Sequence, residues 1–245
     1  MRIAIVSDVH GNLPALRAVV DDIARRGVDA IVNLGDSLSG PLLPLETAEY
    51  LMAQPWLQLA GNHERYLLDF SPAKRGLSDQ YAHARLTPPV FEWMAKLKPA
   101  MSFSDEVFLC HATPRRDDEF FLDTIEGSQI RAGSAQEIEE RLGSIAAPVV
   151  ACGHTHIPRV VRTDRDQLLL NPGSVGLQAY LEGRAVVENG APDARYAVVE
   201  RRNGAWSAQL LAVPYDHASM ADLAKSHGRP DWETALQCGH MKAPR

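Results

Sequence analysis

The sequence predicts a two-sheet α/β sandwich, with parallel strands early in the chain and antiparallel strands later. Apolar runs alternate with helical patterns over residues 2–60, as is typical of parallel strands covered by helices. Beyond residue 157, short apolar runs are separated by turn residues, which indicates antiparallel pairing. With 245 residues, 45% of them hydrophobic, the chain can bury a substantial core, and we expect one domain over 1–245.

The first part of the chain predicts strand, helix, strand, helix, strand. A near-continuous apolar run begins the chain, and helical spacing of apolar residues follows it until Gly27. Asn12 can cap this first helix, and Pro14 suits its first turn. The remaining expected elements of this part are strands at 2–7, 30–34 and 57–60 and a helix around 45–53.

Residues 64–97 predict a helical insertion of two or three short helices over the sheet, since prolines and Gly76 interrupt the helical pattern. Residues 112–127 are charged and irregular in pattern, and 214–245 are expected to be a helical C-terminal extension. The other expected elements are a hairpin of 101–103 with 106–110, a helix at 135–142, and strands at 148–152, 159–163, 167–171, 195–200 and 206–213.

Composition excludes several classes of protein. Apolar runs are far shorter than the ~20 residues that span a bilayer, and no secretion signal is evident, so we expect a cytoplasmic protein without a membrane partner. The net charge of −6 argues against binding of a nucleic-acid polymer, which needs a basic surface. Cys110, Cys152 and Cys238 lack paired spacing and read as free thiols, the first two as buried strand residues.

Five short apolar runs end abruptly in Asp, Asn or His. The first run ends at Asp8 and His10; because residues i and i+2 of a strand point to the same side, both can reach one point, as can His154 and His156. Open α/β sheets gather ligands at the carboxyl ends of their strands. The full set of candidate metal ligands is Asp8, His10, Asp36, Asn62, His111, His154 and His156.

This set is too large for one ion that keeps an open position, and it fits two ions better. Carboxylate and imidazole together suit manganese, iron, zinc or nickel rather than magnesium or calcium alone. Asp36 is the candidate for a bridging carboxylate. Two metals about 3.5–4 Å apart form a clamp for in-line displacement at phosphorus, which is a phosphoesterase design.

Taken in this order, the motifs resemble the calcineurin-like metallophosphoesterase superfamily. Asp8-Val9-His10-Gly11-Asn12 and Asn171-Pro172-Gly173-Ser174 further resemble its small YfcE-like phosphodiesterase branch. The resemblance implies a four-layer α/β/β/α sandwich of two mixed β-sheets flanked by helices. It assigns one metal to Asp8, His10, Asp36 and His156, and the other to Asp36, Asn62, His111 and His154.

The resemblance also gives His63 a catalytic role beside Asp36. His63 would stabilise the transition state and protonate the leaving oxygen, and a positioned imidazole contributes ~10²–10⁴-fold as a general acid. Glu64 is the expected orienting partner of His63. Arg115 and Arg116 are candidates to hold a substrate phosphate, or else a solvated charged loop. Asn12 either contacts substrate or only caps its helix.

The sequence thus predicts a metal-dependent phosphoesterase, and within that class a phosphodiesterase acting through a metal-activated hydroxide. A phosphomonoesterase, a phosphoprotein phosphatase and a dinucleoside polyphosphate hydrolase share the same metal clamp. A non-catalytic scaffold like the retromer subunit of this superfamily is the remaining alternative, although this chain keeps every ligand. We expect two divalent ions, manganese first, then iron, zinc or nickel, and a small phosphorylated substrate chosen by segments 37–44, 65–89 and 112–127; oligomeric state leaves no trace in the sequence.

Overall fold

The computed structural model describes residues 1–241 and shows a mixed α/β fold built on two five-stranded sheets. The first sheet consists, in spatial order, of β14 (Ala205–Val213), β13 (Ala194–Arg202), β1 (Arg2–Val6), β2 (Ala30–Asn33) and β3 (Leu57–Gln58). The second consists of β4 (Ala100–Ser104), β5 (Val107–Cys110), β8 (Val149–Ala151), β10 (Leu168–Asn171) and β9 (Arg159–Arg162). Both sheets combine parallel and antiparallel pairs.

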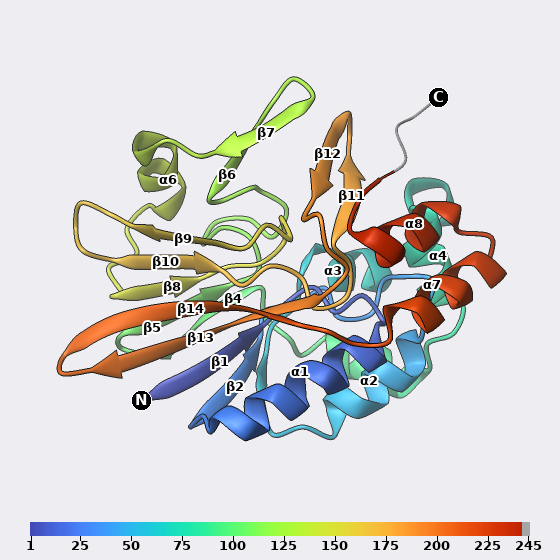
Figure 1. The fold of residues 1–245 in the computed structure, drawn as a ribbon, viewed down its shortest axis with the longest axis horizontal. Helices are drawn as coiled ribbons and strands as arrows, with labels where there is room; N and C mark the ends of the chain where they lie inside the picture. The colour runs from blue at the N-terminus through green and yellow to red at the C-terminus, as the bar shows by residue number, and fades with distance from the viewer. Residues whose placement is uncertain (242–245) are drawn as a thin grey trace.

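The two sheets pack face to face and helices cover their outer faces (Figure 1). Ile5 of β1 lies in one core cluster with Val107 and Leu170 of the second sheet. On the far side of the first sheet, α1 (Leu13–Arg26) buries Leu16 against Val6 and its neighbours. On the far side of the second, α6 (Ala135–Leu142) packs against β5 and β10. The predicted four-layer sandwich is confirmed.

Most predicted elements lie where the sequence placed them. Asn12 caps α1, because its Oδ1 accepts a hydrogen bond from Ala15 N at 3.3 Å. After α2 (Pro44–Met52), the expected helical insertion is a series of short helices broken at the prolines. These helices are α3 (Asn62–Leu68), the 3₁₀ turn Pro72–Lys74, α4 (Leu77–His83) and α5 (Pro88–Met94).

Two small hairpins were not predicted. One joins β6 (Asp123–Glu126) to β7 (Gln129–Ala132), partly within the segment expected to be irregular. The other joins β11 (Ala179–Glu182) to β12 (Ala185–Glu188). Each strand has only four residues, and charged side chains interrupt the apolar alternation that marks a longer strand.

The C-terminal helices α7 (His217–Ser226) and α8 (Pro230–Cys238) pack beside β11 rather than on either sheet (Figure 1). Trp232 and Leu236 of α8 are buried with Leu177 and Ala179, just before and at the start of β11. This packing places α8 next to the ends of the central strands. Within residues 1–241, no helix is both long and apolar enough to cross a bilayer.

Candidate metal centre

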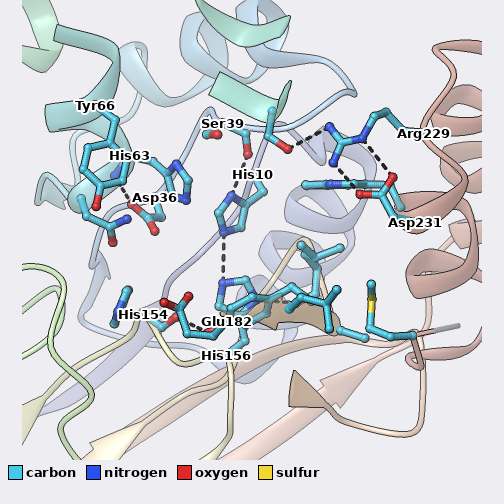
Figure 2. Close-up of a pocket in the computed structure, with 18 of the residues that line it drawn as sticks. His10, Asp36, Ser39, His63, Tyr66, His154, His156, Glu182, Arg229 and Asp231 are labelled. Atoms are coloured by element: carbon cyan, nitrogen blue, oxygen red, sulfur yellow. Dashed lines mark hydrogen bonds and ion pairs between the residues drawn. The ribbon is translucent and has the colours of Figure 1, made fainter. Parts of the chain in front are cut away.

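The predicted ligands lie together beyond the carboxyl ends of β1, β2, β5 and β8. Figure 2 shows four of them, His10, Asp36, His154 and His156. Two groups form there, each with its donor atoms within 4.8 Å of one another. The first group is Asp8, His10 and His156, and the second is Asp36, His111 and His154. Asn62 opens α3, and its Oδ1 lies 3.2 Å from His111 Nε2, beside the second group.

The backbone at these residues is strained. Asp8, His10, Asp36, His154 and His156 all have positive φ, between 52° and 68°. In the described chain only two other non-glycine residues do so, and both are in turns away from this site. Such conformations cost about 1–3 kcal/mol each and persist where surrounding contacts impose them. The strain is therefore concentrated where side chains must turn from strand ends towards one point.

Two glycines let the chain segments approach closely at the same place. A Cβ at Gly61 would overlap Asp36 Oδ1 and would lie 2.7 Å from His111 Cε1. A Cβ at Gly153 would overlap Ser7 Oγ and would lie 2.8 Å from Asp8 Oδ2. Glycine is required at both positions because the Asp36 carboxylate at Gly61, and the Ser7 hydroxyl and Asp8 carboxylate at Gly153, occupy the space of a side chain.

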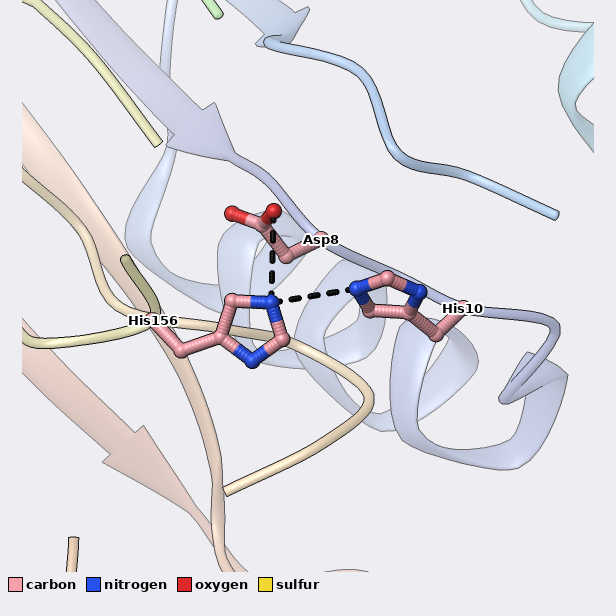
Figure 3. A group of neighbouring side chains, drawn as sticks. All are labelled: Asp8, His10 and His156. Atoms are coloured by element: carbon pink, nitrogen blue, oxygen red, sulfur yellow. Dashed lines mark hydrogen bonds and ion pairs between the residues drawn. The ribbon is translucent and has the colours of Figure 1, made fainter. Parts of the chain in front are cut away.

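In the first group, ring nitrogen and carboxylate oxygen atoms that carry lone pairs face one another (Figure 3). His10 Nδ1 and His156 Nδ1 each donate 2.7 Å hydrogen bonds to the carbonyl oxygens of Ser39 and Leu177, so the Nε2 atoms face inward and lie 3.0 Å apart. Burial and neighbouring His156 lower the pKa of His10 to about 4, so its Nε2 carries a lone pair at neutral pH. Asp8 Oδ1 is buried without a hydrogen-bond partner. A cation fits this donor set.

The second group also gathers buried imidazole and carboxylate side chains, but its His111 is charged in the protein alone. His111 Nδ1 bonds to the Leu34 carbonyl at 2.9 Å, and its Nε2 lies 3.2 Å from both Asp36 Oδ2 and Asn62 Oδ1. Burial lowers the pKa of His111, but the carboxylates, Asp36 first, outweigh this and raise it to about 10. The protein alone thus balances these carboxylates with an imidazolium. A divalent ion would supply that charge instead, so these residues also fit a metal.

His63 is oriented by Asp79, not by Glu64. His63 Nδ1 lies 2.6 Å from Asp79 Oδ1, and Asp79 is brought there by α4 of the helical insertion. Burial lowers the pKa of His63, but Asp36 and Asp79 outweigh it and raise the pKa to about 9. The expectation for Glu64 is wrong. No local motif marks Asp79, because it lies sixteen residues further along the chain than His63.

Glu64 instead fastens two of the site's loops. Its buried carboxylate accepts hydrogen bonds from the backbone N–H groups of Asp36, Ser37 and Gly61 at 2.7–2.8 Å. Burial and the nearby Asp36 carboxylate nevertheless raise the pKa of Glu64. Glu64 thereby holds the loop after β2 against the start of α3.

Hydrogen bonds to Asn171 and Asp123 fix the loop that carries His154 and His156. Thr155 Oγ1 lies between them and bonds to Asn171 Nδ2 at 3.1 Å and to Asp123 Oδ2 at 3.3 Å. Asn171 also donates to the Gly153 carbonyl at 2.6 Å. Asn171 therefore supports the loop that carries His154 and His156, and it does not itself line the cavity.

The predicted substrate contacts are not brought to the centre. Asn12 is fully buried, and its Nδ2 donates to the Gly176 carbonyl and to Tyr215 Oη, both at 2.9 Å. It therefore caps α1 and links it to the segments that carry Gly176 and Tyr215. Arg115 pairs with Glu119 at 2.6 Å and Arg116 with Asp118 at 2.9 Å. Both arginines line a separate surface depression. Their guanidinium groups thus face carboxylates rather than the candidate metal ligands.

The centre opens into a cavity of about 460 Å³. Residues that the sequence did not single out line it beside the predicted ligands (Figure 2). They come from the insertion, from β11 and from α8: Tyr66, Ser78, Tyr180, Glu182, Arg229, Asp231 and Trp232. No motif could have identified them, because they belong to three separate segments.

Comparison with known proteins agrees with this geometry. Over 98% of this chain and 99% of the other, the fold matches a metallophosphoesterase from Sphaerobacter thermophilus, with a TM-score of 0.77 and 25% identity. A hypothetical protein from Pyrococcus horikoshii matches with a TM-score of 0.73 and 15% identity, again over 98% and 99% of the two chains. An uncharacterized protein of Methanocaldococcus jannaschii is 23% identical over 94% of both chains.

Residues 1–188 match the calcineurin-like phosphoesterase superfamily domain, a span that contains every predicted ligand. The two donor groups at its strand ends are of the kind expected for a family that binds divalent metals. The superfamily resemblance drawn from the motifs is therefore confirmed, and this chain belongs to the calcineurin-like phosphoesterase superfamily.

Proposed function

We propose that this protein is a metal-dependent phosphodiesterase with a dinuclear centre. The observation that carries the proposal is the pair of buried donor groups that share one cavity with a charged, oriented histidine. The first ion would be held by Asp8, His10 and His156, and the second by Asn62, His111 and His154. Asp36, which is grouped with His111 and His154, would bind both ions. Mixed nitrogen and oxygen donors favour manganese, iron, zinc or nickel.

Cations bound there would supply positive charge to the phosphoryl oxygens and acidify a water molecule. The chain's own residues do the rest. His63, held through Nδ1 by Asp79, keeps its other ring nitrogen for the substrate, and donates a proton to the leaving ester oxygen as the P–O bond breaks. A cation bound to Asp36 would offset the negative charge with which Asp36 raises the pKa of His63. Asp79 would then be the partner that keeps the His63 imidazolium charged.

The test uses purified protein loaded with manganese, with bis(4-nitrophenyl) phosphate as substrate. Asp36→Ala and His111→Ala are expected to lower kcat/KM by about 10³-fold or more and to lower the metal content per chain. Circular dichroism and thermal melting show whether each variant remains folded. Unchanged turnover in both variants would refute this assignment of the metal centre.

Related reactions are separated by a substrate panel. The same clamp suits phosphomonoesters and dinucleoside polyphosphates, so kcat/KM is compared for 4-nitrophenyl phosphate, diadenosine tetraphosphate and the aryl diester, each with several metals. A higher value for either alternative substrate would replace the diesterase assignment. Fewer than one bound ion per chain, together with a stable protein complex and no turnover, would instead support a scaffold.

A further inference from the structure

The cavity extends well beyond the candidate metal ligands. In Figure 2, Asp36, His63 and His154 lie at one end, and Arg229 and Asp231 of the α8 region lie at the other. The cavity is therefore larger than a phosphoryl group needs, and its second end would hold an organic part of the substrate. We call it the α8 end; its residues are Ser78, Arg229, Asp231 and Trp232.

Trp232 connects the two ends. Its ring lies edge-on to His10, with 6.2 Å between ring centroids, and the Arg229 guanidinium carbon is 5.8 Å from the Trp232 ring centroid. Leu177, Ala179 and Leu181, leading into and along β11, add apolar lining. A group that extends from a phosphorus atom at the metal centre towards Arg229 therefore meets an apolar wall first.

The polar groups at the α8 end are fixed in advance. Arg229 donates to both carboxylate oxygens of Asp231, at 3.0 and 2.6 Å, and to Ser78 Oγ at 3.0 Å. The Arg229 side chain is only 13% exposed. Because guanidinium and carboxylate balance each other, this end offers hydrogen-bond donors and acceptors but no net charge.

Additional carboxylates line the cavity near the metal end. Glu182 of β11 lies beside His154 and His156 in Figure 2. Asp118 also lines the cavity, but its charge is balanced by Arg65 at 3.4 Å and Arg116 at 2.9 Å. Like charges placed together across a binding surface oppose binding. A second phosphate beside Glu182 would meet its negative charge, and one at the α8 end would find the Arg229 guanidinium already paired with Asp231.

We infer that the cavity selects phosphodiesters with a single negative charge whose organic arm is uncharged, lies along Trp232 and ends in a group that both donates and accepts hydrogen bonds at Arg229 and Asp231. A nucleoside arm has this chemistry; a polyphosphate does not. This inference rests on the proposed function and narrows it, because it names the substrate class and the residues that choose it.

Two matched probes test the inference: thymidine 5′-(4-nitrophenyl phosphate), which has a neutral nucleoside arm, and its 3′-phosphorylated form. The wild type is expected to hydrolyse the first with a kcat/KM about tenfold or more above that of the second. Glu182→Gln is expected to reduce this ratio by about threefold or more. Glu92→Gln, which removes an equal charge from the exposed face of α5, is the control and should leave the ratio unchanged.

Arg229→Gln provides an independent readout at the other end. It is expected to raise KM for the nucleoside probe about tenfold, with a smaller change in kcat and no change in bound metal. Equal or faster hydrolysis of the phosphorylated probe would overturn the inference while leaving the phosphodiesterase assignment in place. No turnover of any phosphoester by the metal-loaded protein would overturn both.

Discussion

The two ends of the cavity are built in different ways. At the metal end, the candidate ligands lie within a few residues of a strand end or, for Asn62, open a helix, and five of them have strained backbone conformations that turn their side chains inward. At the α8 end, the side chains have ordinary helical or loop backbones and come from the insertion and the C-terminal helix. We propose that the first end supplies the chemistry and the second the substrate choice, so variants at the two ends should change different kinetic constants.

The largest effect within this comparison is expected at the proton donor. His63→Ala should lower kcat by about 10²–10⁴-fold, since it removes the proposed general acid. Asp79→Asn should lower kcat less, by about 10–100-fold, because the imidazole remains but loses its charged partner. In both variants the metal content should stay at the wild-type value. Loss of metal in His63→Ala would mean that His63 is a ligand rather than a proton donor.

Gly61→Ala should lower both metal binding and activity, although Gly61 itself carries no functional group. The added methyl would overlap Asp36 Oδ1 and press on His111, and displacing reacting groups by about 1 Å costs roughly 10²-fold in rate. Bound metal per chain and kcat/KM for the aryl diester measure this. Gly76→Ala is the matched control, since a Cβ there meets nothing within 4 Å. Equal behaviour of the two variants would contradict the close packing at Gly61.

Asn171→Ala should have a smaller effect that reaches both metal groups. Removing its amide frees the Gly153 carbonyl and Thr155 Oγ1, and so loosens the loop that gives one histidine to each group. Supporting residues of this kind change metal affinity by about 10–100-fold. Titration with manganese should show both ions weakened. Weakening of neither ion would show that the loop is held without Asn171.

Arg115→Gln should have the smallest effect. Arg115 lies outside both ends of the cavity, and its partner Glu119 is on the same exposed loop. Exposed ion pairs of this kind add little to stability. Values of kcat/KM for the aryl diester should stay within about twofold of the wild type. A tenfold loss would restore Arg115 as a phosphate-binding residue and would extend the site beyond the cavity.

The sequence by itself determined the layered α/β fold and the identity of the residues at the metal end. Strand and helix periodicity are local, and they place His111 directly after β5 and Asp8 two residues after β1. The positive φ of Asp8, which turns its side chain inward, was not predicted. The pattern of apolar runs located the strand ends, and the candidate ligands follow those ends in the sequence. It also placed His154 and His156 on one loop.

Only the tertiary structure decided which residues hydrogen-bond to the residues of the metal end and which line the cavity across from them. Glu64 is adjacent to His63 in the chain, yet α3 turns its carboxylate towards the backbone of Asp36, and Asp79 reaches His63 instead. Arg229 and Trp232 enter the cavity because α8 packs on β11. The physical reason is that such contacts depend on how separate elements pack, and no periodicity within one element encodes the position of another.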